Sequence, residues 1–173
     1  GKQLSQLGAD VVKVDEDPEG ARAALPLPVS HEQLNRGKRS MVLDFKEPRD
    51  AHLLKTLLAR TDVIVENFTV GTAERLRIDE ASVRAYTPGI VYVYLNTYGR
   101  SGPWAPHRGF AEVANVTTGI TERTIEEEVV PLSGAASPSL DYPRWYFTDY
   151  AAGVLGAFCL LYTSPSPRDR QKS

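Results

Sequence analysis

The sequence has little cysteine and histidine. It contains one cysteine, Cys159, and three scattered histidines, His31, His52 and His107. A single cysteine can form neither an internal disulfide framework nor a cysteine-rich zinc site, and scattered histidines offer a metal ion few ligands. We therefore expect no metal, and the lack of paired cysteines favours a cytoplasmic protein.

Long apolar runs and an excess of one charge are also missing. No stretch approaches the ~20 apolar residues that a membrane-spanning helix needs, and no signal-peptide pattern is present at the start. The formal net charge of −2 gives no bulk electrostatic attraction to nucleic acid or to a membrane surface, so we expect neither partner. Gly1 already lies in amphipathic sequence, and we expect native sequence before it.

Three common catalytic or nucleotide-binding motifs are absent. There is no Gly-x-Gly-x-x-Gly after the first expected strand, no Gly-x-x-x-x-Gly-Lys-Ser/Thr loop and no Gly-x-Ser-x-Gly elbow. These absences weaken a dinucleotide-binding interpretation and argue against a nucleoside triphosphatase and a serine hydrolase.

What the sequence does contain is an alternation of strand and helix patterns. Strands are predicted at 11–14, 41–44, 63–65 and 90–95, and helices at 2–7, 48–60, 69–76, 79–86, 110–118 and from 148 or 149 onward. We expect loops at 15–28 and 96–109, and irregular structure at 119–145 with one strand near 129–130. The alternation predicts an α/β fold with an open, Rossmann-like, mainly parallel sheet flanked by helices.

Polar and aromatic residues follow the third expected strand. Glu66, Asn67 and Phe68 stand at its carboxyl end, and Gly71 and Arg75 come shortly after. Ligands of open parallel sheets bind just past the carboxyl ends of strands, which predicts a ligand-binding edge here. A strand followed by a plain helix cap explains the same stretch equally well.

Several cations are candidates for holding phosphate. The segment 34–40 includes Lys38 and Arg39, whose side chains suit phosphate oxygens, although a solvated basic turn is the favoured interpretation of this segment taken alone. Arg22 and Arg75 would add to the same positive surface, and each by itself is typical of an ordinary surface arginine. Arg108 precedes an expected helix start, a position that suits an anion, or else belongs to a polar loop.

Asp149 is the strongest candidate for a reactive group. It stands at the expected start of a helix rich in small residues, after the aromatic run 145–147. A helix start stabilises a carboxylate in its ionised form. Simple helix capping is the structural alternative.

The last fifteen residues have a different character. Residues 159–169 resemble a translated transposon adapter, and a Ser-Pro-Ser-Pro stretch replaces the apolar helical pattern of 150–158. We expect native sequence to end near Phe158, with 159–173 encoded by an adapter. Codons for 159–169 that do not spell an adapter would contradict this expectation.

Four segments taken together resemble the family III CoA-transferases of the CaiB/BaiF type. They are 7–14, 34–40, 62–75 and 148–153, and their order and spacing cover nearly all of 4–158. The resemblance implies that 1–158 is part of a large CoA-binding domain. It also implies a downstream Gly-rich loop and a small domain, and assembly into an interlocked homodimer.

The resemblance implies transfer of coenzyme A between an acyl-CoA and a carboxylic acid. Asp149 matches the aspartate that takes up the acyl group in such enzymes. The implied CoA contacts are Arg22, Lys38, Arg39, Asn67, Phe68, Arg75 and Arg108. Residues 119–147 are expected to line the acyl pocket.

Two other functions remain open. An acyl-CoA racemase on the same fold uses a His in a Gly-His-Asp context, where this chain reads Gly109-Phe110-Ala111 with His107 offset. Transferase is therefore favoured over racemase. The other is a non-enzymatic CoA-binding module. The 173 residues by themselves are expected to be inactive and prone to aggregation.

Overall fold

The computed structural model describes residues 1–16, 28–124 and 147–163. The chain divides into two units, one containing Gly1–Leu95 and the chain from Gly153 on, the other Asn96–Ala152. Each unit is described by itself. Arg22 and the strand expected near 129–130 lie outside the described residues.

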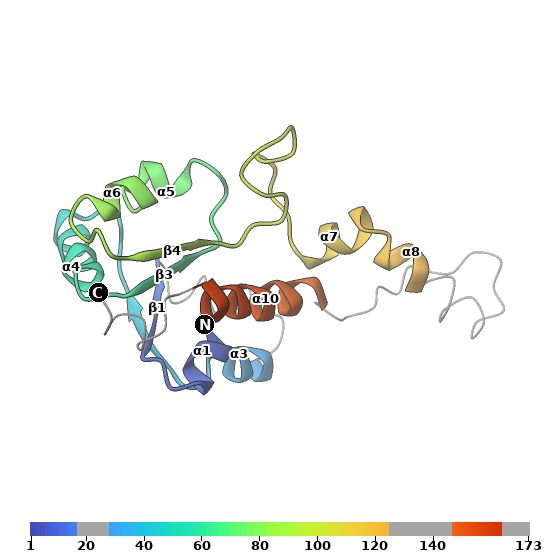
Figure 1. Cartoon of the computed structure of the whole chain (residues 1–173), viewed down its shortest axis with the longest axis horizontal. Helices are drawn as coiled ribbons and strands as arrows, with labels where there is room; N and C mark the ends of the chain where they lie inside the picture. Colours follow the sequence, from blue (N-terminus) through green and yellow to red (C-terminus); the bar gives the residue numbers. More distant parts are fainter. Residues whose placement is uncertain (17–27, 125–146, 164–173) are drawn as a thin grey trace. The chain divides into compact units, whose positions relative to one another are not determined.

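The strands of the first unit pair in parallel (Figure 1). They are β1 (Val11–Asp15), β2 (Lys38–Val42), β3 (Val63–Glu66) and β4 (Val91–Tyr94). β1 pairs with β2, and β3 pairs with β4, so the described strands form two two-stranded sheets. Helices separate the two strands of each pair along the chain, as parallel pairing requires. The α/β class with parallel strands is confirmed.

Short helices occupy most of the remaining described chain. The first unit holds α1 (Lys2–Gln6), α3 (Pro28–Asn35), α4 (Pro48–Leu58), α5 (Thr72–Arg75) and α6 (Glu80–Arg84). The second holds α7 (Ala111–Thr117) and α8 (Ile120–Thr124), and α10 (Phe147–Thr163) runs from the second unit into the first. No described helix is both long and apolar enough to cross a membrane.

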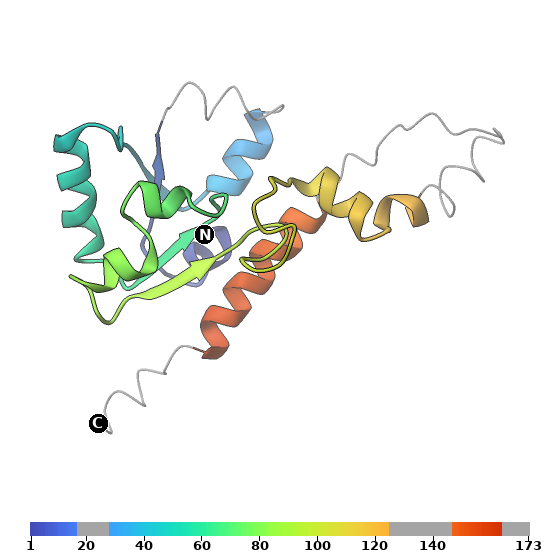
Figure 2. The same ribbon diagram turned by 90° about the horizontal axis from the view of Figure 1, so that it is seen from above.

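The core of the first unit forms around α4, which connects β2 to β3 (Figure 2). Leu54 and Leu58, one helical turn apart, are buried. The neighbouring Leu53 is 45% exposed, so only part of the leucine-rich run of α4 is buried. The buried cluster consists of Leu43, Leu54, Leu58, Ala73, Ile78, Val83 and Ile90.

Three predictions about the first unit need correction, two near β2 and one after β3. β2 begins at Lys38 instead of 41, and it is preceded by α3, which was not predicted. The residues of β2 show no alternation of apolar and polar side chains that would mark a strand, and four of the five are exposed. The helix expected after Thr69 instead begins after Gly71, whose φ of 87° suits glycine.

Two further differences lie near the end of the chain. Residues 120–124, expected to be irregular, form α8. α10 continues past Phe158 to Thr163, and its Leu160 is buried. The origin of the residues after Phe158 stays a prediction.

Candidate functional site

The carboxyl end of β3 presents one side chain to solvent and buries another. Glu66, the last residue of β3, is only 8% exposed, and its Oε2 accepts a hydrogen bond from the backbone N–H of Phe68. Phe68 packs partly against the apolar cluster, whereas Asn67 is exposed. Glu66 therefore orders the turn that follows β3, and Asn67 is the residue that this turn exposes.

Arg75 follows the same strand on a tightly turned segment. It ends α5, its side chain is exposed, and its Nη2 donates a hydrogen bond to Thr72 Oγ1 at 2.9 Å. Asn67, Phe68 and Arg75 thus lie together on the segment past the carboxyl end of β3, where the edge rule for parallel sheets predicts a ligand.

Lys38 and Arg39 open β2 and extend to opposite faces of the β1–β2 pair, because successive side chains of a strand alternate. On one face, Lys38 Nζ donates a hydrogen bond to Asn35 Oδ1 at 2.9 Å. Partial burial, followed by the charge of Lys13, lowers the pKa of Lys38. These two cations do not face a common point.

Arg39 is already engaged on the other face. Its Nε donates to Asp10 Oδ1 at 2.9 Å, and its Nη2 pairs with Asp10 Oδ2. Both side chains are exposed, so this two-bond ion pair adds little to stability and can be exchanged for another anion at small cost.

Lys46, which no sequence motif marks, lies past the carboxyl end of β2. Its Nζ stands 3.9 Å from Glu16 Oε1, and Glu16 follows β1. Lys46 follows a parallel strand just as Asn67 does, so the same rule about strand ends could have identified it from the sequence.

In the second unit, Arg108 belongs to the loop that leads into α7. Thr97 Oγ1 donates a hydrogen bond to the carbonyl oxygen of Gly109 at 2.8 Å, and a Cβ at Gly109 would come within 2.6 Å of Thr97. Glycine is therefore required for this close approach. Arg108 is exposed, and Phe110, 70% exposed, is the N-cap of α7.

Asp149 lies in the first turn of α10, also in the second unit. Because α10 begins at Phe147, Asp149 lies inside the first turn of the helix and is not the N-cap residue itself. Thr148 Oγ1 donates a hydrogen bond to the carbonyl oxygen of Ala111 at 3.3 Å, which holds the start of α10 beside the start of α7.

The electrostatic environment of Asp149 differs from the one expected. Removal from water and then the charge of Glu112 raise the pKa of the Asp149 carboxyl above its usual range. These effects outweigh the stabilisation that a helix start gives to a carboxylate. A carboxylate with a raised pKa is a more basic, and hence better, nucleophile once ionised.

The structure thus groups the predicted residues in three places. Asn67, Phe68 and Arg75 follow β3, and Lys38 and Arg39 begin β2. Arg108 and Asp149 both lie close to the start of α7. Within residues 1–16, 28–124 and 147–163, no group of His, Cys, Asp or Glu could hold a metal ion.

Parallel strand pairs define an α/β protein, and the exposed polar residues past one strand end make that sheet edge a candidate ligand site. Comparison with known proteins gives the family. The profile described as CoA-transferase family III matches residues 1–164. The chain belongs to CoA-transferase family III.

Curated relatives include transferases and a racemase. Succinate–glutarate CoA-transferase of Agrobacterium fabrum is 31% identical over 151 residues, which are 79% of this chain and 38% of the relative. Succinyl-CoA:glutarate CoA-transferase of Mus musculus is 29% identical over 88% of this chain and 37% of its own. Human alpha-methylacyl-CoA racemase is 38% identical over 57% of this chain and 24% of its own.

Solved structures agree with this family. A CAIB/BAIF family protein from Brucella suis has a TM-score of 0.78 and 27% identity, covering 94% of this chain and 43% of its own. The protein Rv3272 from Mycobacterium tuberculosis has a TM-score of 0.77 and 29% identity, covering 92% of this chain and 43% of its own. The chain therefore spans about two fifths of the length of the relatives that cover most of it.

Proposed function

We propose that the protein containing this chain transfers coenzyme A between an acyl-CoA and a carboxylic acid, with Asp149 as the nucleophile. The observation that carries the proposal is the position of Asp149 in a family III CoA-transferase chain. The residue keeps much of its surface exposed, and its partly desolvated carboxylate accepts no hydrogen bond from another described residue. A carboxylate without such a hydrogen bond to a described residue supports a role in covalent chemistry.

The reaction divides one difficult exchange into easier acyl transfers. An Asp149 carboxylate oxygen attacks the thioester carbonyl carbon, the C–S bond breaks, and CoA leaves as thiolate, giving an acyl-aspartyl anhydride. The thiolate then attacks the Asp149 carbonyl carbon and releases the donor acid as carboxylate. The acceptor carboxylate attacks the carbonyl carbon of the resulting aspartyl-CoA thioester, the C–S bond breaks, and CoA leaves again as thiolate from a second anhydride. The thiolate finally attacks the acceptor's carbonyl carbon in this anhydride, and the C–O bond to Asp149 breaks. Asp149 is regenerated.

The remaining predicted residues would bind CoA. Asn67 and Phe68 would meet the adenine or the pantetheine arm at the end of β3, and Arg75 and Arg108 would face phosphates. Lys38 and Arg39 begin β2 on opposite faces, so we propose that they contact different groups of the ligand. Arg22 is proposed as a further phosphate contact.

Covalent trapping tests the proposal in the whole protein. During turnover with acyl-CoA, hydroxylamine should convert Asp149 to a hydroxamate, which mass spectrometry locates. Several of the relatives are named for succinate, glutarate or malate, so these dicarboxylates are the first acids to assay.

Substitution of the nucleophile gives the second test. Asp149→Asn should lower kcat by roughly 10³-fold or more, while Glu32→Gln, which removes an exposed acid on α3, should leave kcat unchanged. Full activity of Asp149→Asn would instead support a non-enzymatic CoA-binding module or another nucleophile.

The racemase relative justifies one alternative. An acyl-CoA racemase would exchange the α-hydrogen of its substrate with deuterated solvent and would need no acceptor acid. Phe110 occupies the N-cap of α7, next to Gly109, where the racemase motif has its histidine. Exchange without an acceptor in the whole protein would favour the racemase.

We also propose that the whole protein is a cytoplasmic, interlocked homodimer, and that the 173 residues alone are inactive. Catalysis requires reacting groups held in a fixed geometry, and the chain spans only part of its relatives. Sedimentation of the whole protein at the mass of one chain would contradict the dimer.

A further inference from the structure

Two acidic side chains lie beside the hydrogen bond that joins α7 and α10. Thr148 Oγ1 donates to the carbonyl oxygen of Ala111 at 3.3 Å, and Ala111 is buried, so this joint is anchored. Asp149 and Glu112 directly follow the two bonded residues, each in the first turn of its own helix. Both residues keep much of their surface exposed, and the Asp149 carboxyl is partly removed from water.

The charge of Glu112 acts on Asp149. Removal from water is the larger cause of the raised pKa of Asp149, and the Glu112 carboxylate is the second. Both belong to one unit, so this interaction needs no other part of the chain. Two like charges held near each other disfavour the ionised form of each.

We propose that Glu112 is a positioning residue for the nucleophile, destabilising the ionised Asp149 side chain relative to its neutral, acylated form and so speeding attack on the thioester. The inference rests on the proposed function. When an Asp149 oxygen bonds to the acyl carbon and the C–S bond breaks, the negative charge departs with the CoA thiolate. The repulsion from Glu112 exists before this step and is gone after it.

A purely structural role for Glu112 makes a different prediction. An acidic residue in the first turn of a helix stabilises that helix through its dipole. In that role Glu112 would affect the stability of α7 and leave the titration and reactivity of Asp149 unchanged.

The experiment compares Glu112→Gln, Glu112→Asp and Glu32→Gln in the whole protein. Glu32 is the control, because it is an exposed acid on a helix, α3, and none of the proposed site residues belongs to that helix. Two quantities are measured: the titration midpoint of the Asp149 carboxyl by ¹³C NMR, and the rate of CoA thiol release in a single turnover without acceptor.

Glu112→Gln should lower the titration midpoint of Asp149 and slow CoA release about threefold to tenfold, with KM for acyl-CoA unchanged. Glu112→Asp should restore both quantities, and Glu32→Gln should alter neither. High salt should reduce the difference between wild type and Glu112→Gln, because exposed charges are screened.

An unchanged Asp149 titration in Glu112→Gln overturns the inference, as does CoA release at the wild-type rate. Failure of the proposed function looks different. If hydroxylamine labels no Asp149 in the wild-type enzyme, the proposed function is wrong. If it labels Asp149 and Glu112→Gln still reacts at the wild-type rate, only the role of Glu112 is wrong.

Discussion

At the scale of single residues, burial and hydrogen bonding separate structural side chains from available ones. Glu66 stands at a strand end, yet its carboxylate is buried and accepts the Phe68 N–H. Asp79 caps α6 through bonds to Ser82. Asp149 is only partly desolvated and accepts no hydrogen bond from another described residue, which is consistent with its proposed role as the nucleophile.

The raised pKa of Asp149 predicts the acid limb of the pH–rate profile. Because a protonated carboxyl is not a nucleophile, kcat/KM of the whole protein should begin to fall on acidification at a higher pH than an ordinary aspartate would give. A folded-state pKa above the unfolded value also means that the contribution of Asp149 to stability is greatest at low pH and is lost as pH rises through the folded pKa. An acid limb in the usual aspartate range would contradict this.

The pKa of Asp79 is shifted in the direction opposite to that of Asp149. Its hydrogen bonds with Ser82 lower its pKa, so its stabilising contribution is present above the usual aspartate range and is lost as pH falls through the lowered pKa. Asp79→Ala should lower the free energy of unfolding by about 1 kcal/mol near neutral pH. Asp79→Asn keeps a capping oxygen and should retain most of this stability without its pH dependence. Urea denaturation of the whole protein measures both.

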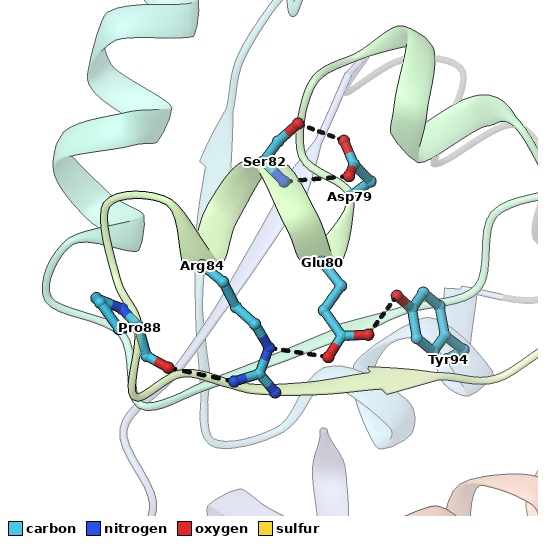
Figure 3. Close-up of polar contacts among 6 residues, drawn as sticks. All are labelled: Asp79, Glu80, Ser82, Arg84, Pro88 and Tyr94. Carbon is cyan, nitrogen blue, oxygen red and sulfur yellow. Dashed lines mark hydrogen bonds and ion pairs between the residues drawn. The ribbon is translucent and has the colours of Figure 1, made fainter.

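At the scale of elements, polar contacts fasten α6 to β4 (Figure 3). Glu80 accepts hydrogen bonds from Tyr94 OH at 3.0 Å and from Arg84 Nε at 2.8 Å, and Arg84 also donates to the carbonyl oxygen of Pro88. Next to Tyr94, Tyr92 OH donates to the carbonyl oxygen of Ile78 at 2.7 Å. These hydrogen bonds hold β4 in place beside β3, and Asn67 follows the carboxyl end of β3.

Removing the hydroxyl of Tyr94 tests how much its hydrogen bond to Glu80 stabilises the fold. Tyr94→Phe should lower the free energy of unfolding by about 1 kcal/mol, since Glu80 loses a hydrogen bond while the ring remains. Tyr98→Phe is the control, because Tyr98 contacts Trp104 through its ring. Equal loss of stability in the two variants would show that the Tyr94 hydroxyl has no specific effect.

At the scale of the whole molecule, apolar side chains remain uncovered in both units. Examples are Met41 and Val42 on β2, Val116 on α7, and Leu155 and Phe158 on α10. Extensive exposed apolar surface is characteristic of a face that another part of a protein covers. This chain matches less than half of the length of these relatives.

The 173 residues expressed alone should therefore self-associate and bind a hydrophobic dye. Analytical ultracentrifugation over a concentration series, with dye fluorescence in parallel, measures this. Phe158→Ser, which removes one of the larger exposed apolar groups, should reduce association. A monomer that binds no dye and turns over acyl-CoA would contradict both this prediction and the proposed inactivity.

The sequence by itself determined the α/β class, most element positions and the family. These depend on local signals: apolar periodicity, turn residues and motifs read in order. Only the tertiary structure decided that Glu66 is buried, that Lys38 and Arg39 diverge, and that Glu112 lies near Asp149. The start of β2 at Lys38 belongs with these, because pairing with β1 extends a strand that its own residues do not mark. Pairing, burial and contacts between distant helices depend on which segments meet in space, and no local pattern carries that information.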